Sequence, residues 1–144
     1  MSDNPGQRLT IESNPDPDHV RLLEDSLDAF NLQTTGITDN ELLAISLRGS
    51  DGEVVGGAYG WTWGETCHIR YLFVPAQMRN QGHGTRMMRA IEQEAVARRC
   101  RQIVLETHDF QAPDFYRRLG FAVVDVVDGY PHGHQYLTML KRLP

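Results

Sequence analysis

The sequence predicts a mixed α/β domain in which helices cover both faces of one central sheet. Its apolar residues switch between a period of two and a period near 3.6, giving the order strand, helix, three strands, helix, strand, helix and two strands. Some of these strands are joined through helices and others through tight turns, so the sheet should be mixed. A chain of 144 residues without repeats or linkers has the size of one ordinary domain. We therefore expect a single domain over residues 1–144, with residues 1–8 as a loose N-terminal tail.

The N-terminal third should contain one strand and one amphipathic helix. The segment "RLTIES" (8–13) reads as a short strand. Asp16 followed by Pro17 is typical of a helix N-cap and first helical residue. An apolar stripe at helical spacing then predicts a helix to about Asn31, formed by Val20, Leu23, Leu27 and Phe30. The next segment, "LQTTGITDN" (32–40), is typical of a loop.

The remaining elements alternate between strands and helices. "GSDGE" is typical of a turn and predicts a hairpin around it, and the Gly56–Gly57 pair indicates a bulge or a close backbone neighbour. The continuous apolar run in "QIVLET" is typical of a strand covered on both faces. The expected strands are 42–48, 54–63, 67–74, 102–107, 121–127 and 135–142, and the expected helices are 82–99 and 112–119.

Composition limits the kind of protein. The formal net charge of −5 disfavours a nucleic-acid partner, which would require clustered Lys and Arg. The two cysteines, Cys67 and Cys100, lack metal-ligand spacing, and the sequence shows no secretory segment and no apolar run long enough for a membrane span. We therefore expect a cytoplasmic protein with reduced thiols and no membrane partner.

A glycine-punctuated loop, "RNQGHGT" (79–85), leads directly into a helix. The first N–H groups of a helix have no partners within it, and the helix dipole is positive there, so such a loop suits an anionic ligand. Two common nucleotide loops are disfavoured. A P-loop requires a Lys that is absent here, and a dinucleotide fingerprint requires a third glycine where Met87 stands.

The segment "LFVPAQMRNQGHG" resembles the acetyl-CoA signature of the GNAT superfamily of N-acetyltransferases, Arg/Gln-x-x-Gly-x-Gly/Ala. About thirty residues later, "DFYRRLGF" resembles the helix-to-strand segment of the same superfamily. The resemblance covers Tyr59 to about Val127 and implies a central mixed, mostly antiparallel sheet of six to seven strands. The order of elements read from the periodicity agrees with this independently.

The resemblance implies that the protein transfers an acetyl group from acetyl-CoA to a primary amine of a small molecule or a protein, by direct attack in a ternary complex. The backbone of the glycine loop would then bind the pyrophosphate, with Arg79 adding charge. A main-chain N–H at Phe73 or Val74 would stabilise the thioester oxyanion, and the strand would splay from its neighbour to admit the pantetheine arm. The implied acetyl-CoA residues are Phe73, Val74, Arg79, Asn80, Gln81, Gly82, His83, Gly84 and Thr85.

Proton transfer calls for an acid and a base. A thiol, with a pKa near 8.5, can take a proton from a tyrosine, with a pKa of about 10, and Tyr116 matches the usual acid of the superfamily. A lysine-like amine must lose a proton before it attacks, and the candidates for the base are Glu65, His68, Glu106 and His108. We select His68, which lies where some relatives carry a Glu, and water remains an alternative.

The sequence says least about the acceptor. The family pattern is weakest in residues 31–41, where relatives usually have a second helix, and in the loop "DGYPHGH", from which Tyr130 and His134 are predicted to contact the substrate. His132 and His134 have a spacing that a metal site can use, but no further ligand accompanies them, so we expect no metal.

Two other classes of function remain open. A non-catalytic acyl-CoA-binding module or regulator would keep the glycine loop without the proton-transfer groups. A regulator that binds nucleic acid would use the local Arg cluster, which the acidic total disfavours. A homodimer is possible and the sequence does not decide it.

Overall fold

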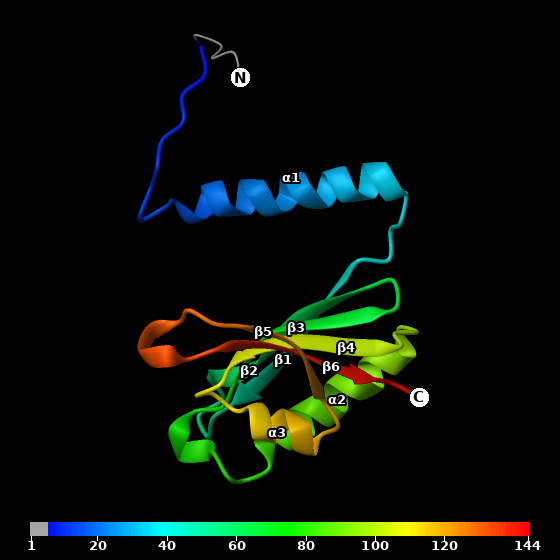
Figure 1. The fold of residues 1–144 in the computed structure, drawn as a ribbon. Coiled ribbons are helices and arrows are strands. Elements are labelled where there is room, and N and C mark those ends of the chain that lie inside the picture. The colour runs from blue at the N-terminus through cyan, green and yellow to red at the C-terminus, as the bar shows by residue number, and fades with distance from the viewer. Residues whose placement is uncertain (1–5) are drawn as a thin grey trace. The chain divides into compact units, whose positions relative to one another are not determined.

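A computed structural model describes residues 6–144, which form two compact units: the chain up to Thr38 and the chain from Asp39 to Pro144 (Figure 1). Each unit is described separately. Of the tail predicted at residues 1–8, residues 1–5 lie outside the described residues, and residues 6–8 are exposed and belong to no helix or strand. The prediction of a single domain over 1–144 stays a prediction.

The first unit contains one helix, α1 (Pro17–Thr35). The Asp16 carboxylate accepts a hydrogen bond of 2.9 Å from the Asp18 N–H, as the predicted N-cap requires. The helix runs four residues further than predicted, to Thr35, and is capped by Gly36, which adopts φ = 69° and donates its N–H to the Leu32 carbonyl.

The prediction of a strand at residues 8–13 is wrong. These residues form no strand, and the side chains of Leu9 and Ile11 are fully exposed. A strand is stabilised by hydrogen bonds to a neighbouring strand, and within residues 6–38 this segment has no such neighbour. Alternating apolar residues alone could not reveal that absence.

The second unit is a six-stranded sheet with two α-helices. Its strands have the order β1-β2-β3-β4-β6-β5, and every neighbouring pair is antiparallel except β3 and β4. The predicted mixed, mostly antiparallel sheet is therefore confirmed, with six strands. The elements are β1 (Glu41–Arg48), β2 (Val54–Trp63), β3 (Thr66–Phe73), α2 (His83–Ala97), β4 (Gln102–His108), α3 (Pro113–Arg118), β5 (Ala122–Val127) and β6 (Tyr136–Arg142), with two short 3₁₀ turns, η1 (Ala76–Met78) and η2 (Pro131–Gly133).

Both helices of this unit lie on the same side of the sheet, as Figure 1 shows, so for residues 39–144 alone the expected cover of both faces stays a prediction. The buried core lies between them and the sheet, and Ile91 of α2, Ile103 of β4 and Met139 of β6 are completely covered. Side chains alternate between the two faces of a strand, so Cys67 and Ile69 of β3 face the helices while His68 points to the opposite face. The same alternation on β4 buries Leu105 and Thr107 and turns Glu106 and His108 to the face opposite the helices.

The Gly56–Gly57 pair lies where three strands pack backbone to backbone. A Cβ on Gly56 would lie 2.5 Å from the Phe73 carbonyl oxygen of β3, and one on Gly57 would lie 2.0 Å from the Ile45 oxygen of β1. The predicted close backbone neighbour is confirmed, because no side chain fits at either position.

Candidate active site

The two parallel strands at the centre of the sheet pair over only half of their length. Their register runs from Thr66 opposite Gln102 to Ile69 opposite Leu105, although β3 continues to Phe73 and β4 to His108. In the pairing of β3 with β2, Tyr59 faces Tyr71 and Gly60 faces Ile69, which leaves Arg70 as an extra residue. A bulge of this kind bends its strand, and here it coincides with the point where β3 separates from β4.

The separation frees part of the β3 backbone. The Phe73 carbonyl lies beside Gly56 of β2, so the Phe73 peptide groups face that strand. In a strand, successive residues direct their N–H and C=O groups to opposite sides, so the N–H groups of Leu72 and Val74 face the separated edge. Of the two donors predicted from sequence, Val74 thus has the more favourable direction, and Leu72 joins it as a candidate that the sequence reasoning missed.

A hydrogen-bonded pair, His68 and Glu106, lies next to the last residues that β3 and β4 share. The distance from His68 Nε2 to Glu106 Oε2 is 2.8 Å, and about a quarter of each side chain is exposed. An ionised carboxylate can only accept hydrogen bonds, so Nε2 is the donor of this bond, and in the neutral form of the imidazole Nδ1 keeps a lone pair. The Trp61 ring, 4.8 Å from the imidazole, covers one side of it. This pair has the arrangement of a base held by an orienting carboxylate.

The other two base candidates lie elsewhere on the sheet. Glu65 precedes β3 at the far end of the paired region, where its side chain lies 3.5 Å from Arg101 and its carbonyl accepts the N–H of that residue. His108 follows Glu106 by two residues on the same face and packs among aromatic rings, 4.7 Å from the ring of Tyr136. Burial and the nearby Glu106 charge raise the pKa of Tyr136.

The glycine loop presents a row of free backbone donors. Gly82 is the N-cap of α2 with φ = 81° and ψ = 6°, and its carbonyl accepts the first hydrogen bond of the helix, from Arg86. Within residues 6–144, no protein acceptor pairs with the N–H groups of residues 80–85. A Cβ on Gly82 would have no heavy atom within 4 Å, so the space beside it is open. These features fit an anionic group such as a pyrophosphate.

Side chains of the loop hold its shape. The Arg79 Nε donates to the Val74 carbonyl at 2.9 Å, which ties the loop to the end of β3. His83 Nδ1 lies 2.6 Å from Arg86 Nη2, so this nitrogen accepts from the guanidinium. Gln81 donates to the Gln77 carbonyl at 3.2 Å. Arg79 and Arg86 also place two positive charges beside the free N–H groups.

Gly84 has a packing role that its sequence motif did not indicate. A Cβ at this position would lie 3.1 Å from the tip of the Phe115 ring, closer than ordinary contact. Gly84 therefore lets the first turn of α2 approach α3.

Tyr116 lies on the helix side of the sheet and is 8% exposed. Its ring packs edge-on against Phe115 and Phe121, and burial raises the pKa of its hydroxyl. The tyrosine and the His68–Glu106 pair thus lie on opposite faces of the sheet, and β3 separates from β4 next to the pair.

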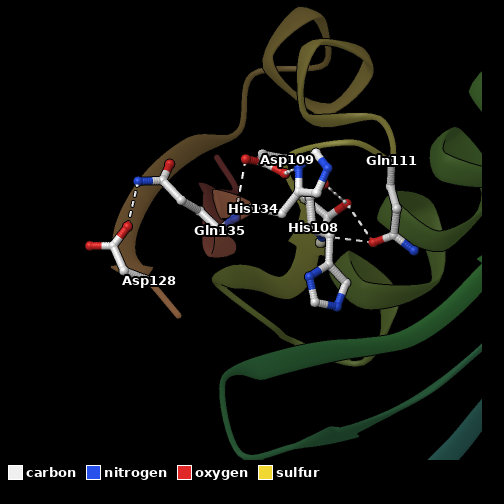
Figure 2. A network of polar contacts seen from close by, with 7 residues as sticks. His108, Asp109, Gln111, Asp128, His134 and Gln135 are labelled. Carbon is white, nitrogen blue, oxygen red and sulfur yellow. Dashed lines mark hydrogen bonds and ion pairs between the residues drawn. The ribbon is translucent and has the colours of Figure 1, made fainter. Parts of the chain in front are cut away.

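The two predicted substrate residues, Tyr130 and His134, line a hollow of about 410 Å³ at the end of β4. His134 Nδ1 is 2.8 Å from an Asp109 carboxylate oxygen (Figure 2). The Tyr130 ring stands edge-on to His108. In the part of the chain that the structure describes, no group of three His, Cys, Asp or Glu side chains is arranged to hold a metal ion.

Comparison with known proteins decides the family. The model of the "Acetyltransferase (GNAT) family" matches residues 8–121. The chain is 31% identical to an acetyltransferase of Agrobacterium fabrum over 88% of this chain and 93% of that protein. It is 36% identical to blasticidin-S acetyltransferase of Streptomyces morookaense over 72% of this chain and 76% of that protein. The chain belongs to the GNAT family of acetyltransferases.

The crystal structure of a candidate acetyltransferase from Agrobacterium tumefaciens agrees with the fold of this GNAT chain. It superposes with a TM-score of 0.84 at 28% identity and covers 95% of this chain and 100% of that one. The predictions of GNAT membership, of the sheet architecture and of an acetyltransferase enzyme are thus confirmed. Among residues 6–144 there is no helix with the length and hydropathy that a membrane span requires.

Sequence reasoning missed several residues that this GNAT structure places at the site. Phe110 and Tyr136 join His108, Tyr130 and His134 in one group of rings, and Asp109 holds the loop that carries two of them. The alternation in "ETHDF" could have placed Glu106, His108 and Phe110 on one side. Nothing in the sequence could have shown that the loop before β6 returns to them.

Proposed function

We propose that this GNAT chain transfers an acetyl group from acetyl-CoA to a primary amine of a small molecule or peptide. The transfer would take place by direct attack in a ternary complex. The observation that carries the proposal is the His68–Glu106 pair, with its 2.8 Å hydrogen bond, at the point where β3 and β4 separate. The named relative that acts on blasticidin S supports a small-molecule acceptor.

The glycine loop would bind the pyrophosphate of acetyl-CoA. The free N–H groups of residues 80–85, the open space at Gly82 and the charges of Arg79 and Arg86 support this assignment. When bound, acetyl-CoA supplies the acetyl group as a thioester, whose C–S bond breaks as a C–N bond to the amine forms. Leu72 and Val74 would direct N–H groups at the carbonyl oxygen, where negative charge develops.

His68 would accept the proton that the amine loses. Its Nδ1 is the free acceptor, and the Glu106 carboxylate would stabilise the positive imidazolium that results. Tyr116 would donate a proton to the departing thiolate. Burial raises the pKa of its hydroxyl above the usual value near 10, so the hydroxyl carries its proton at neutral pH.

The test is an assay for free CoA thiol over a panel of primary amines, with the product identified by mass. We expect acetylation of at least one amine, and a kcat lowered about tenfold or more in a Tyr116→Phe variant, which keeps the packed ring and loses only the hydroxyl. Binding of acetyl-CoA by calorimetry, without acetylation of any amine, would show instead a non-catalytic acyl-CoA-binding module. An undiminished kcat in Tyr116→Phe would refute the role of Tyr116.

A further inference from the structure

The hollow at the end of β4 is walled almost entirely by rings. Its volume is about 410 Å³, within the range of small-molecule sites. It lies between the residues that follow Thr107 and the connection from β5 to β6. The residues that line it are His108, Phe110, Tyr130, Pro131, His132 and His134.

The rings that line the hollow form one stacked pair and two edge-on contacts. His108 and Phe110 are stacked with centroids 5.1 Å apart and planes 9° from parallel. Tyr130 stands edge-on to His108 at 4.8 Å, and His134 stands edge-on to Phe110 at 4.7 Å. Phe110 nevertheless remains 59% exposed, so a large part of its surface is available to a ligand.

Several polar groups around the hollow hold its frame through hydrogen bonds, as Figure 2 shows, whereas the buried Nδ1 of His108 has no partner among the described residues. One Asp109 carboxylate oxygen lies 2.8 Å from His134 Nδ1, and the other accepts the Gln135 N–H at 3.1 Å. The Gln111 amide oxygen accepts the His108 N–H at 2.6 Å, and Gln135 donates to Asp128 at 2.9 Å. The Asp109 carboxylate is thus engaged on both oxygens, and the surface facing the hollow is aromatic rather than charged.

One residue of the hollow, His108, lies next to the proposed reaction site along β4. His108 follows Glu106 by two residues on the same face of β4, and two residues span about 7 Å along a strand. Tyr136 lies opposite His108 in the register with β6, and its ring links His108 to Tyr130. A molecule in the hollow would contact His108, the next residue on this face of β4 after Glu106, and an amine on a short linker would extend from there toward the pair.

We propose that this hollow binds a flat aromatic or heteroaromatic ring of the acceptor, whose primary amine is carried on a linker of two or three atoms. This inference rests on the proposed function. A flat ring can stack on the exposed face of Phe110 and meet the edges of Tyr130 and His134, whereas a saturated ring cannot stack in the same way. The charged end of the acceptor belongs at the His68–Glu106 pair, because the Asp109 carboxylate is already engaged.

The test compares amines that differ only in the ring. The series is benzylamine, 2-phenylethylamine and 3-phenylpropylamine, each paired with its cyclohexyl counterpart. We expect kcat/KM to be about tenfold higher for the aromatic member at the best linker length, and the best length to be two or three carbons. Calorimetry with CoA present should show the same order of Kd values, which gives a readout independent of turnover.

Variants of the hollow make the test specific. In Phe110→Leu the aromatic-to-cyclohexyl ratio of kcat/KM should fall toward one, whereas in Phe110→Tyr, the matched control that keeps a ring, it should stay high. Tyr130→Leu removes a ring from another part of the hollow and should lower the ratio too. If Phe110→Leu does not fold, the ratio measured in Tyr130→Leu tests the ring site in its place.

The outcomes separate this inference from the proposed function. Acetylation of amines without a preference for aromatic members, or an unchanged ratio in a folded Phe110→Leu variant, would overturn the ring site and leave the acetyltransferase proposal standing. Failure to acetylate any amine, with no amine bound in calorimetry, would overturn both.

Discussion

At the scale of single residues, the hydrogen bond between His68 and Glu106 joins two strands at the point where they part. Cys67 and Ile69, on either side of His68, anchor β3 in the core, and Leu105 does the same for Glu106 on β4. His68 belongs to the paired part of β3, and Glu106 is the first residue of β4 beyond that pairing, where it still pairs with Thr138 of β6. The hydrogen bond to Glu106 orients the His68 imidazole.

Replacing the two members of the pair should show that Glu106 acts through His68. We expect His68→Gln to lower kcat/KM for an alkylamine by about 10²- to 10⁴-fold and Glu106→Gln to lower it less. The double variant should be no slower than His68→Gln alone, because a positioning residue has no effect once its partner is gone. Steady-state kinetics on the three variants measures this. A Glu106→Gln loss larger than that of His68→Gln would make Glu106 the base.

The acceptor amine provides an independent check of the base. An amine with a pKa near 10.4 is almost wholly protonated at pH 7, whereas an α-amine with a pKa near 8 is neutral in about a tenth of molecules. The loss in His68→Gln should therefore be larger for the first kind of amine than for the second. An equal loss for both would indicate that His68 only supports the structure.

At the scale of elements, the entry to α2 combines an unusual backbone with open space. Gly82 has a positive φ of 81° and no neighbour where a Cβ would lie. Gly52, in the turn between β1 and β2, has nearly the same φ of 82° and the same lack of neighbours. The two glycines differ in that only Gly82 caps a helix whose first N–H groups are free, so they form a matched pair for mutation.

Gly82→Val and Gly52→Val should destabilise the protein to a similar extent, by about 1–2 kcal/mol from backbone strain. Only Gly82→Val should weaken binding of CoA, by about tenfold or more, since a branched side chain would occupy the proposed pyrophosphate position. Denaturant titration and calorimetry on both variants measure the two effects. Equal CoA affinity in the two variants would refute the placement of the pyrophosphate.

Gly84 should behave differently from Gly82, because its Cβ would meet Phe115. We expect Gly84→Ala to destabilise the protein, and the added change Phe115→Leu to recover part of the loss by making room for the methyl group. Thermal unfolding of the single and double variants measures this. If Phe115→Leu adds to the loss instead, the contact between the first turn of α2 and α3 does not limit this position.

At the scale of the whole molecule, the core of residues 39–144 contains ionisable groups that must stay neutral. Burial and the nearby Cys100 raise the pKa of the Cys67 thiol from 9.0 to about 11, and burial also raises the pKa values of Cys100 and Tyr116. A raised pKa means that the folded state favours the protonated form. The stability contributed in this way is present below the unfolded pKa and is lost as pH rises through the folded pKa.

The free energy of unfolding should therefore fall between about pH 9 and 11, with Cys67 contributing about 2–3 kcal/mol of the fall. Urea titrations across this range measure the effect, and Cys67→Ala, which has no thiol to ionise, should show a smaller fall. A free-energy curve for Cys67→Ala parallel to that of the unaltered protein would contradict the prediction. The native thiols should also resist a thiol reagent at pH 8 until urea exposes them.

Much of the sheet could be predicted because its signals are local. The alternation in "CHIRYLFV" and the apolar run in "QIVLET" each fit within one strand, and Pro113 and Gly120 mark the limits of α3 without reference to the rest of the chain. The strand predicted at residues 8–13 failed for the complementary reason, because a strand also needs a neighbour, which no local pattern supplies. The end of α1 was placed too early because Gly36, rather than Asn31, provides the left-handed cap.

The sequence by itself determined the family and the glycine loop, because both depend on short, contiguous segments whose backbone demands are local. Only the tertiary structure decided which distant residues lie together: Glu106 with His68, Asp109 with His134, and Phe115 with Gly84. These contacts depend on strand register, on the bulge at Arg70 and on the path of the loop before β6. A register shift of one residue would turn His68 into the core and Cys67 outward, so the proposed base exists only in the folded sheet.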